Sequence, residues 1–354
     1  MTDTMDIKIK KIKVSRLSSV DFTSLTFGNI FSDHMFMADY IDGHWKNCQI
    51  MPYGDLAFSP AMVTLHYGQS IFEGIKAYRQ PNSQIAIFRP IKNFERLNIS
   101  AERLCMPTIP EELFMQGLTK LINLDRQWVP SAKGQSLYIR PLMFATDTIL
   151  GVHPSKSYKF IILTGPVGSY YSKNLKVKIE IKYSRADDGG VGYAKTGGNY
   201  ARSLYPTKLA MQEGFDQLIW TDAKEHTYVE EAGTANIMFV LNNVLITPST
   251  RDTILNGVSR HTILDLARSW GMPVEERRIS VNEIIEGQQA GNLQEAFAAG
   301  TAATIAQISE IGYQDVLYSL PDPKQAVFSN KVLTALNDIR YGLAPDQFDW
   351  NYLV

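Results

Sequence analysis

The stretch GGVGYAKTGGNYA, residues 189–201, carries a single lysine, Lys195, with glycines on both sides. Its glycines follow neither the GxxxxGK[ST] spacing of a P-loop nor the GxGxxG spacing of a dinucleotide-binding turn, so a nucleotide-binding, doubly wound sheet is not predicted. Glycine lets the backbone approach a flat ligand closely while the Lys195 ammonium reaches it. Taken alone, however, the local pattern is more typical of a surface turn that carries a solvated lysine.

The segments on both sides of this stretch predict an α+β chain. Helical and alternating patterns are mixed without a steady βαβ rhythm. Helices are predicted at residues 90–104, 111–124, 200–211, 258–270 and 324–341. Strands are predicted at residues 83–89, 136–144, 159–166, 177–183, 217–221, 237–241 and 295–298. The polar, turn-rich segment 168–174 indicates a connection between two domains.

Composition excludes several classes of protein. The 354 residues suffice for about two domains, and the formal net charge of −1 gives no footprint for nucleic acid or an anionic membrane. Cys48 and Cys105 are the only cysteines and the six histidines lack metal-ligand spacing, so no disulfide scaffold and no metal site is predicted. No apolar run approaches the roughly 18 residues of a membrane span. The N-terminus lacks the apolar core of a signal peptide, so we expect a cytoplasmic protein.

Three short segments carry polar groups that suit a binding site. Glu230 and Glu231 are adjacent in a predicted strand, where side chains alternate, so one carboxylate is expected to turn inward and the other to stay in solvent. The segment 257–259 opens a predicted helix, whose free amides attract anions. The small-residue segment 300–302 offers a hydroxyl and bare amides. Solvated strand-end acids, ordinary helix capping and a tight turn remain the alternatives.

Two arginines stand at the ends of apolar strands. Arg89 (AIFRP) and Arg140 (LYIRP) are each followed by proline. An arginine in this position is typical of a bidentate clamp for a carboxylate or phosphate. Arg185, which precedes the glycine-rich stretch, is more ambiguous.

In order along the chain, these segments resemble the branched-chain amino-acid aminotransferases of the fold-type IV pyridoxal-phosphate enzymes. The resemblance covers nearly the whole chain. Its eight blocks are FGNIFSDHMFMADY (27–40), HYGQSIFEGIKAY (66–78), FRPIKNFERL (88–97), SLYIRP (136–141), VGYAKTGGNYA (191–201), EAGTANIMF (231–239), NGVSR (256–260) and AAGTAA (298–303).

The resemblance implies a set of residues that bind pyridoxal 5'-phosphate. Lys195 matches the lysine that forms the internal aldimine, and Glu231 matches the carboxylate that faces the pyridine nitrogen, with Glu230 as its outward neighbour. A carboxylate there keeps the ring nitrogen protonated, which makes the ring an electron sink. Tyr200 matches the tyrosine that hydrogen-bonds the phenolic oxygen. The residues expected around the phosphate are Arg89, Arg185, Val258, Ser259 and Thr301.

The resemblance also implies the substrate site and the reaction. The amides of Thr301 and Ala302 would bind the substrate carboxylate, and Arg140 would meet the second carboxylate of glutamate. An aromatic wall for a branched side chain is expected from Phe27, Tyr67, Phe72 and Tyr138. The expected reaction is ping-pong transamination of leucine, isoleucine or valine with 2-oxoglutarate, by a homodimer with no nucleic-acid or membrane partner. A D-amino-acid aminotransferase or an aminodeoxychorismate lyase remains the alternative.

The implied organisation is a smaller N-terminal α/β domain (1–168), an interdomain loop (169–182) and a larger C-terminal cofactor-binding domain (183–354) with a pseudo-barrel of strands. The chain departs from the family pattern in two places. Residues 304–307 read TIAQ where mammalian members carry a CxxC pair, so no thiol redox switch is expected. Ser259 stands where a second valine is expected, and its hydroxyl could donate to the phosphate.

Overall fold

The computed structural model describes residues 6–168 and 173–354. These residues form two compact units. The first contains residues 6–168, 194–197 and 338–354, and the second contains residues 173–193 and 198–337. Lys195 therefore belongs to the first unit, although the rest of its glycine-rich stretch belongs mainly to the second.

A nine-stranded sheet forms the framework of the first unit. Its order is β1-β3-β2-β8-β7-β5-β6-β18, with β4 paired to β7, and every pairing except β1–β3 is antiparallel. The strands are β1 (Lys8–Ile9), β2 (His34–Ile41), β3 (His44–Pro52), β4 (Ser70–Phe72), β5 (Ile75–Arg79), β6 (Ile85–Phe88), β7 (Ser136–Ala145), β8 (Tyr158–Val167) and β18 (Asn351–Leu353).

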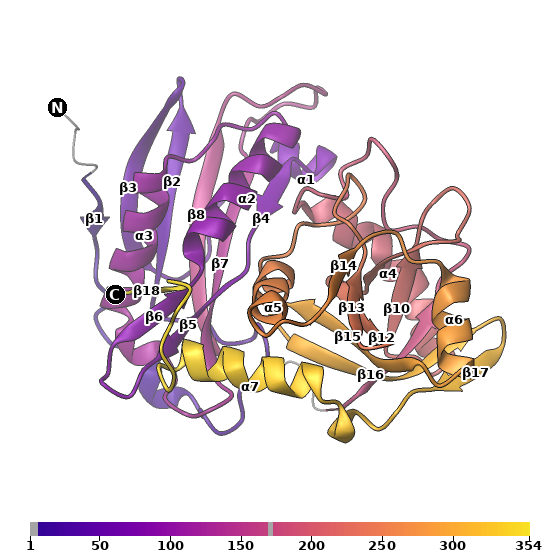
Figure 1. Cartoon of the computed structure of the whole chain (residues 1–354). Coiled ribbons are helices and arrows are strands. Elements are labelled where there is room, and N and C mark those ends of the chain that lie inside the picture. Colours follow the sequence, from indigo (N-terminus) through magenta and orange to yellow (C-terminus); the bar gives the residue numbers. More distant parts are fainter. Residues whose placement is uncertain (1–5, 169–172) are drawn as a thin grey trace. The chain divides into compact units, whose positions relative to one another are not determined.

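Two helices cover one face of this sheet (Figure 1). They are α2 (Pro90–Arg103) and α3 (Glu111–Leu124), and α3 packs its apolar stripe of Leu113, Leu118 and Leu121 into the core. Pro90 suits the first turn of α2, where no intrahelical acceptor exists for an amide. A short helix, α1 (Val63–Tyr67), precedes β4.

The second unit is built around a closed barrel of six strands. The ring closes because β11 pairs with β12 as well as with β10, and its order is β11-β10-β9-β16-β15-β12. The barrel strands are β9 (Leu175–Ile179), β10 (Gln217–Thr221), β11 (Val229–Ala232), β12 (Ala235–Leu241), β15 (Leu293–Gly300) and β16 (Thr304–Tyr313). The strands β13 (Val244–Thr247), β14 (Val274–Glu276) and β17 (Val316–Ser319) extend the sheet.

Helices accompany the barrel strands. They are α4 (Gly197–Gln212), α5 (Val258–Ser269) and α6 (Val281–Gln289), of which α5 and α6 contact β15. The last helix, α7 (Phe328–Arg340), begins among residues of the second unit and ends in the first. Across residues 6–168 and 173–354, no helix has both the length and the apolar character needed to cross a membrane.

The predicted α+β class, with a barrel of strands in the C-terminal part, is confirmed. The helix predicted at 111–124 and the strand predicted at 217–221 match α3 and β10 residue for residue. The hairpin of β2 and β3 was not predicted. Its signal is the Asp42–Gly43 turn, where both residues have positive φ, as a two-residue hairpin turn requires.

The division into units differs in detail from the expected domains. Residues 169–172 of the expected loop lie outside the described residues, and 175–179 of that loop form β9 of the barrel. Residues 338–354 join the first unit because β18 pairs with β6. The first unit therefore contains more of the chain than the expected N-terminal domain.

Candidate active site

Lys195 is fixed through its backbone to the first unit. Its amide donates to Ser100 Oγ of α2 at 2.9 Å, and its carbonyl accepts from the amide of Phe72 at 3.0 Å. The next residue, Thr196, donates its hydroxyl to Ser70 O at 2.7 Å. Main-chain anchors on both sides of the lysine hold its Cα in place and leave the side chain to reach the site.

An aromatic and cationic cluster lies beside this lysine. Lys195 Nζ is 4.8 Å from the centre of the Phe72 ring, and Arg140 Cζ is 4.6 Å from the same ring. Arg140 donates to the Tyr138 hydroxyl at 2.9 Å, and the Phe27 ring packs edge-on against Tyr138 at 4.8 Å. The structure thus brings together Lys195 and four of the residues predicted for the substrate site.

A buried carboxylate that was not predicted supports this cluster. Glu73 is fully buried directly after Phe72 and forms hydrogen bonds with Arg96 Nε at 2.6 Å and with Asn93 Nδ2 at 2.7 Å. Burial alone would raise the pKa of Glu73, but Arg96 and then Lys195 lower it below its usual range. Two features of the sequence could have identified Glu73. It is an acid inside the apolar run SIFEGI, which predicts a buried partner, and Asn93 and Arg96 are spaced to present two donors from one face of a helix.

Gly74 shows how closely the chain passes the cluster. A Cβ at this position would lie 2.5 Å from the Tyr138 hydroxyl oxygen. The glycine is needed because any side chain here would displace Tyr138, and with it the hydrogen bond to Arg140.

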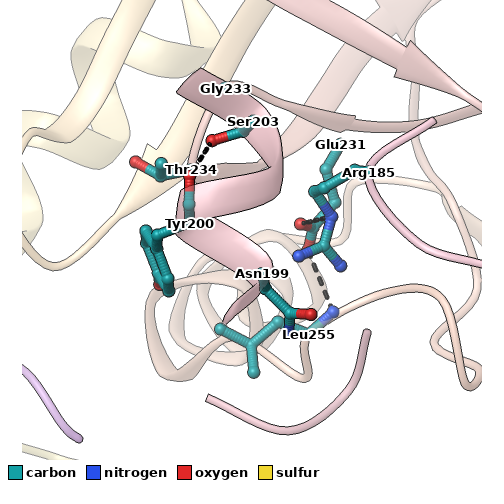
Figure 2. A pocket seen from close by; sticks show the side chains of 8 residues that line it. All are labelled: Arg185, Asn199, Tyr200, Ser203, Glu231, Gly233, Thr234 and Leu255. Atoms are coloured by element: carbon teal, nitrogen blue, oxygen red, sulfur yellow. Dashed lines mark hydrogen bonds and ion pairs between the residues drawn. The ribbon is translucent and has the colours of Figure 1, made fainter. Parts of the chain in front are cut away.

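In the second unit, Glu231 and Arg185 form a buried ion pair. Glu231 Oε2 lies 2.8 Å from Arg185 Nε, while Oε1 accepts from the Leu255 amide at 2.9 Å and from Asn236 Nδ2 at 3.1 Å. Two hydrogen-bond donors and one ion pair therefore hold this buried carboxylate. Figure 2 shows this pair at a pocket that Tyr200 and Asn199 of α4 also line.

Arg185 is held by further groups besides Glu231. Its Nη2 donates to Gly192 O at 3.0 Å and also to Thr253 O. The structure therefore places Arg185 against the carboxylate predicted to face the ring nitrogen. The predicted role of Arg185 near a phosphate stays a prediction.

The expectation that Glu230 stays in solvent is wrong. Glu230 and Glu231 are both buried, with 5% and 2% of their surfaces exposed. The ladder between β10 and β11 pairs Trp220 with Glu231 and Thr221 with Val229, so Glu230 is skipped in a β-bulge. A bulge breaks the alternation of side chains along a strand, and bulges occur next to active sites, where they re-aim a side chain.

Asn236 connects three parts of the site. It pairs with Glu231 on β11 and with Ala299 on β15, and its Nδ2 also donates to Leu255 O at 2.8 Å. A Cβ at Gly257 would lie 1.9 Å from Asn236 Oδ1, so only glycine fits there. Asn236 therefore adjoins both the residue that precedes α5 and the strand β15 that leads to Thr301.

The start of α5 has the properties of an anion site. Gly257 is the N-cap, and no side chain caps the helix. The amides of the first turn have no acceptor within a helix and carry the positive end of its dipole. Val258 and Ser259 occupy this turn, and Thr301 and Ala302 form the turn between β15 and β16.

Arg89 and Tyr67 belong to the first unit. Arg89 has φ +49° just before α2, donates its amide to Trp350 O at 2.7 Å, and stacks its guanidinium 5.1 Å from the Trp350 ring. A non-glycine residue with positive φ is a strained conformation that is frequent at functional sites. Tyr67 is 47% exposed and donates its hydroxyl to Leu150 O at 3.1 Å.

The donor set suits a phosphorylated aromatic cofactor. A buried, hydrogen-bonded carboxylate such as Glu231 is a partner for a protonated ring nitrogen, and a phenol such as Tyr200 is a partner for a ring oxygen. The uncapped start of α5 suits the phosphate. The residues present therefore fit pyridoxal 5'-phosphate.

Comparison with known proteins assigns the chain to a family. The family "Amino-transferase class IV" matches residues 70–311. Branched-chain-amino-acid transaminase 1 of Bacillus subtilis is 44% identical over 335 residues, which cover 93% of this chain and 94% of that protein. The branched-chain aminotransferase of Thermoproteus uzoniensis, solved with norvaline, has a TM-score of 0.74 at 25% identity and covers 90% of this chain and 99% of its own.

A further solved structure carries a cofactor derivative. The T.th. branched-chain amino acid aminotransferase, solved with pyridoxamine 5'-phosphate, has a TM-score of 0.70 at 25% identity and covers 89% of this chain and 97% of its own. The family match, the bacterial relative and the two solved structures all point to the same family of aminotransferases. The chain belongs to the branched-chain aminotransferases of the class IV aminotransferase family.

Proposed function

We propose that the protein transfers the amino group of leucine, isoleucine or valine to 2-oxoglutarate, releasing a branched 2-oxo acid and L-glutamate in a ping-pong cycle with pyridoxal 5'-phosphate. The observation that carries this proposal is the buried Glu231, held by Arg185 and Leu255 at a pocket that Tyr200 lines (Figure 2). When bound, the cofactor supplies an electron sink for charge that develops at the substrate Cα.

Lys195 is the residue that we propose to attach the cofactor and to move the proton. Its Nζ would accept the proton that the substrate Cα loses and hold it within the site during the half-reaction. The backbone anchors to Ser100 and Phe72 fix the starting point of the side chain. These two hydrogen bonds support a role in proton transfer, because Nζ must come back to the same position after each transfer.

The remaining residues would hold the cofactor and the substrate carboxylate. We assign the phosphate to the first-turn amides of Val258 and Ser259, the Thr301 hydroxyl and Arg89, with Arg185 kept beside Glu231. The amides of Thr301 and Ala302 would bind the carboxylate that all substrates share. Glu231 would keep the ring nitrogen protonated, and Tyr200 would donate to the ring oxygen.

The Phe72 cluster explains how one site takes both an aliphatic and an acidic side chain. Phe72, Tyr138 and Phe27 provide an apolar wall for a branched side chain. Arg140 lies within this wall, and its Nε is buried without a hydrogen-bond partner among the described residues. Such a donor suits the second carboxylate of glutamate or 2-oxoglutarate.

Replacing Arg140 by methionine is expected to separate the two half-reactions. The value of kcat/KM for 2-oxoglutarate should fall by about 10- to 100-fold, the effect of losing a charge-assisted hydrogen bond. The value for leucine should change less than about threefold, because the apolar wall remains. Steady-state kinetics with each substrate varied in turn measures both, and equal losses for both substrates would contradict the assignment.

We also propose a homodimer in the cytoplasm. An exposed apolar patch on the first unit contains Leu65, Leu150 and Val152, which are 63%, 65% and 83% exposed. Tyr67 belongs to the same patch through its hydrogen bond to Leu150. A second copy of the chain that covers this surface would bury these side chains and Tyr67.

A substrate panel tests the proposed function. The purified protein is supplied with pyridoxal 5'-phosphate, 2-oxoglutarate and one amino donor at a time, and glutamate formation is followed. We expect turnover with L-leucine, L-isoleucine and L-valine, and none with D-alanine. Turnover with D-alanine alone would identify a D-amino-acid aminotransferase, and pyruvate release from aminodeoxychorismate would identify the lyase.

A further inference from the structure

Glu230 is a buried carboxylate that the proposed reaction does not use. Its Oε1 accepts a hydrogen bond from Thr253 Oγ1 at 2.6 Å, whereas its Oε2 is buried and has no hydrogen-bond partner among the described residues. The β-bulge at this position turns the side chain away from solvent. A buried carboxylate with one satisfied oxygen is costly when charged, so its protonated form is favoured.

Charged groups surround Glu230 from several elements. Three charged residues influence Glu230 electrostatically. Arg185 lies in the loop before the glycine-rich stretch, Asp222 lies in the turn after β10, and Glu231 follows Glu230 on β11. Tyr228, Arg251 and Arg278 line the small cavity that it shares with Asp222. Burial raises the pKa of Glu230 to about 7, helped by the charges of Glu231 and Asp222, while Thr253 and Arg185 lower it.

Arg185 connects Glu230 to Glu231. Its Nε pairs with Glu231 at 2.8 Å, and its Nη2 donates to the backbone carbonyl of Thr253, the residue whose hydroxyl bonds Glu230. The same guanidinium therefore pairs with Glu231 and acts through its charge on Glu230. The attraction between the positive charge of Arg185 and Glu231 is strongest when Glu230 is neutral.

We propose that Glu230 is a positioning residue for Glu231. When Glu230 is protonated, it is neutral and Arg185 interacts with Glu231 alone. When Glu230 loses its proton to solvent, its negative charge competes with Glu231 for the Arg185 guanidinium through the Thr253 segment. Loss of the proton adds negative charge behind Glu231, so the ring nitrogen of a bound cofactor keeps its own proton more firmly. The inference rests on the proposed function, since it takes Glu231 to face that nitrogen.

The test is a pH titration of the absorption spectrum of the bound cofactor. We compare the wild type with Glu230→Gln, which fixes the neutral state, from about pH 5.5 to 9. The wild-type spectrum should show an inflection near pH 7 that Glu230→Gln lacks. At high pH the variant should keep the spectrum of the wild type at low pH, and an unchanged inflection in Glu230→Gln would overturn the inference.

Two further variants serve as controls. Glu225→Gln makes the same chemical change on an exposed residue five positions earlier, so its inflection should match that of the wild type. Thr253→Val removes the hydrogen bond that lowers the pKa of Glu230 and should move the inflection to higher pH. If Glu230→Gln fails to fold, the direction of the Thr253→Val shift decides, and no shift or a downward shift would contradict the inference.

A second readout needs no cofactor. The folded-state pKa of Glu230 lies above its ordinary value of 4.5, so its contribution to stability is complete below about pH 4.5 and is lost as the pH rises through about 7. The unfolding free energy of the wild type should therefore fall relative to Glu230→Gln between about pH 4.5 and 7 and level off above that range. If the difference in unfolding free energy between the wild type and Glu230→Gln did not change with pH, the titration of Glu230 would be contradicted. If that difference changes with pH as expected but the protein binds no cofactor, only the proposed function is contradicted.

The comparison must be between variants because another group titrates in the same range. Burial, and then the charge of Arg340, lower the pKa of Lys76 to about 7. Its contribution to stability is present at high pH and is lost as the pH falls through 7, opposite in sign to that of Glu230. Lys76 is the same in all variants, so it cancels from the difference.

Discussion

Lys195→Ala is expected to abolish transamination, with kcat reduced by at least about 10⁴-fold. No other side chain in the proposed mechanism both attaches the cofactor and moves the proton of the substrate Cα. Both main-chain bonds, from the Lys195 amide to Ser100 and from the Phe72 amide to the Lys195 carbonyl, are independent of the side chain, so the variant should fold as the wild type does. Glutamate formation from leucine and 2-oxoglutarate measures the loss.

Lys208→Ala is the matched control for this result. Lys208 lies on α4, thirteen positions after Lys195, and is exposed, so its loss should leave kcat unchanged. Equal thermal unfolding midpoints for wild type, Lys195→Ala and Lys208→Ala would show that the effect is chemical. A Lys195→Ala enzyme that turns over near the wild-type rate would remove the lysine from the mechanism.

Glu231→Ala is expected to bind the cofactor but to lose at least about a hundredfold in kcat, the scale of removing one preorganised electrostatic partner. Without this carboxylate nothing holds the proton on the ring nitrogen, and the ring becomes a weaker electron sink. The phosphate site at the start of α5 does not involve Glu231, so cofactor binding should persist. Single-turnover kinetics with leucine measures the chemical step directly.

The same substitution has a structural consequence. It leaves Arg185 buried without its carboxylate, together with the Leu255 amide and the Asn236 side chain. Breaking a buried ion pair from one side costs about 3–5 kcal/mol of unfolding free energy. Glu231→Gln keeps the volume and an acceptor oxygen and separates the two effects: it should lose activity but less stability. An unchanged rate in Glu231→Ala, with a loss in Glu230→Gln, would exchange the roles of the two acids.

The sequence predicted those features that depend on local periodicity. The range 111–124 is a helix because Leu113, Leu118 and Leu121 form one apolar stripe, and the structure buries all three. The grouping of Phe72, Tyr138 and Arg140 also followed from the sequence, through the resemblance of their blocks to one family. That grouping is visible in the contacts of the first unit.

Features that depend on pairing between distant segments were not predictable. Burial of Glu230 follows from a bulge in the β10–β11 ladder, and alternation within one strand cannot reveal a shift in register against another. Glu73 was missed because its partners Asn93 and Arg96 lie on a helix about 20 residues away. The place of residues 351–353 depends likewise on a strand pairing with β6 that no local pattern encodes.

The most direct test of the proposed mechanism is the absorption spectrum of the purified protein before and after adding L-leucine. The mechanism predicts a yellow band from cofactor attached to Lys195, which bleaches with leucine and returns with 2-oxoglutarate. Lys195→Ala should lack this band while Lys208→Ala keeps it. A band that ignores leucine but responds to D-alanine, or no band after adding pyridoxal 5'-phosphate, would contradict the central claim.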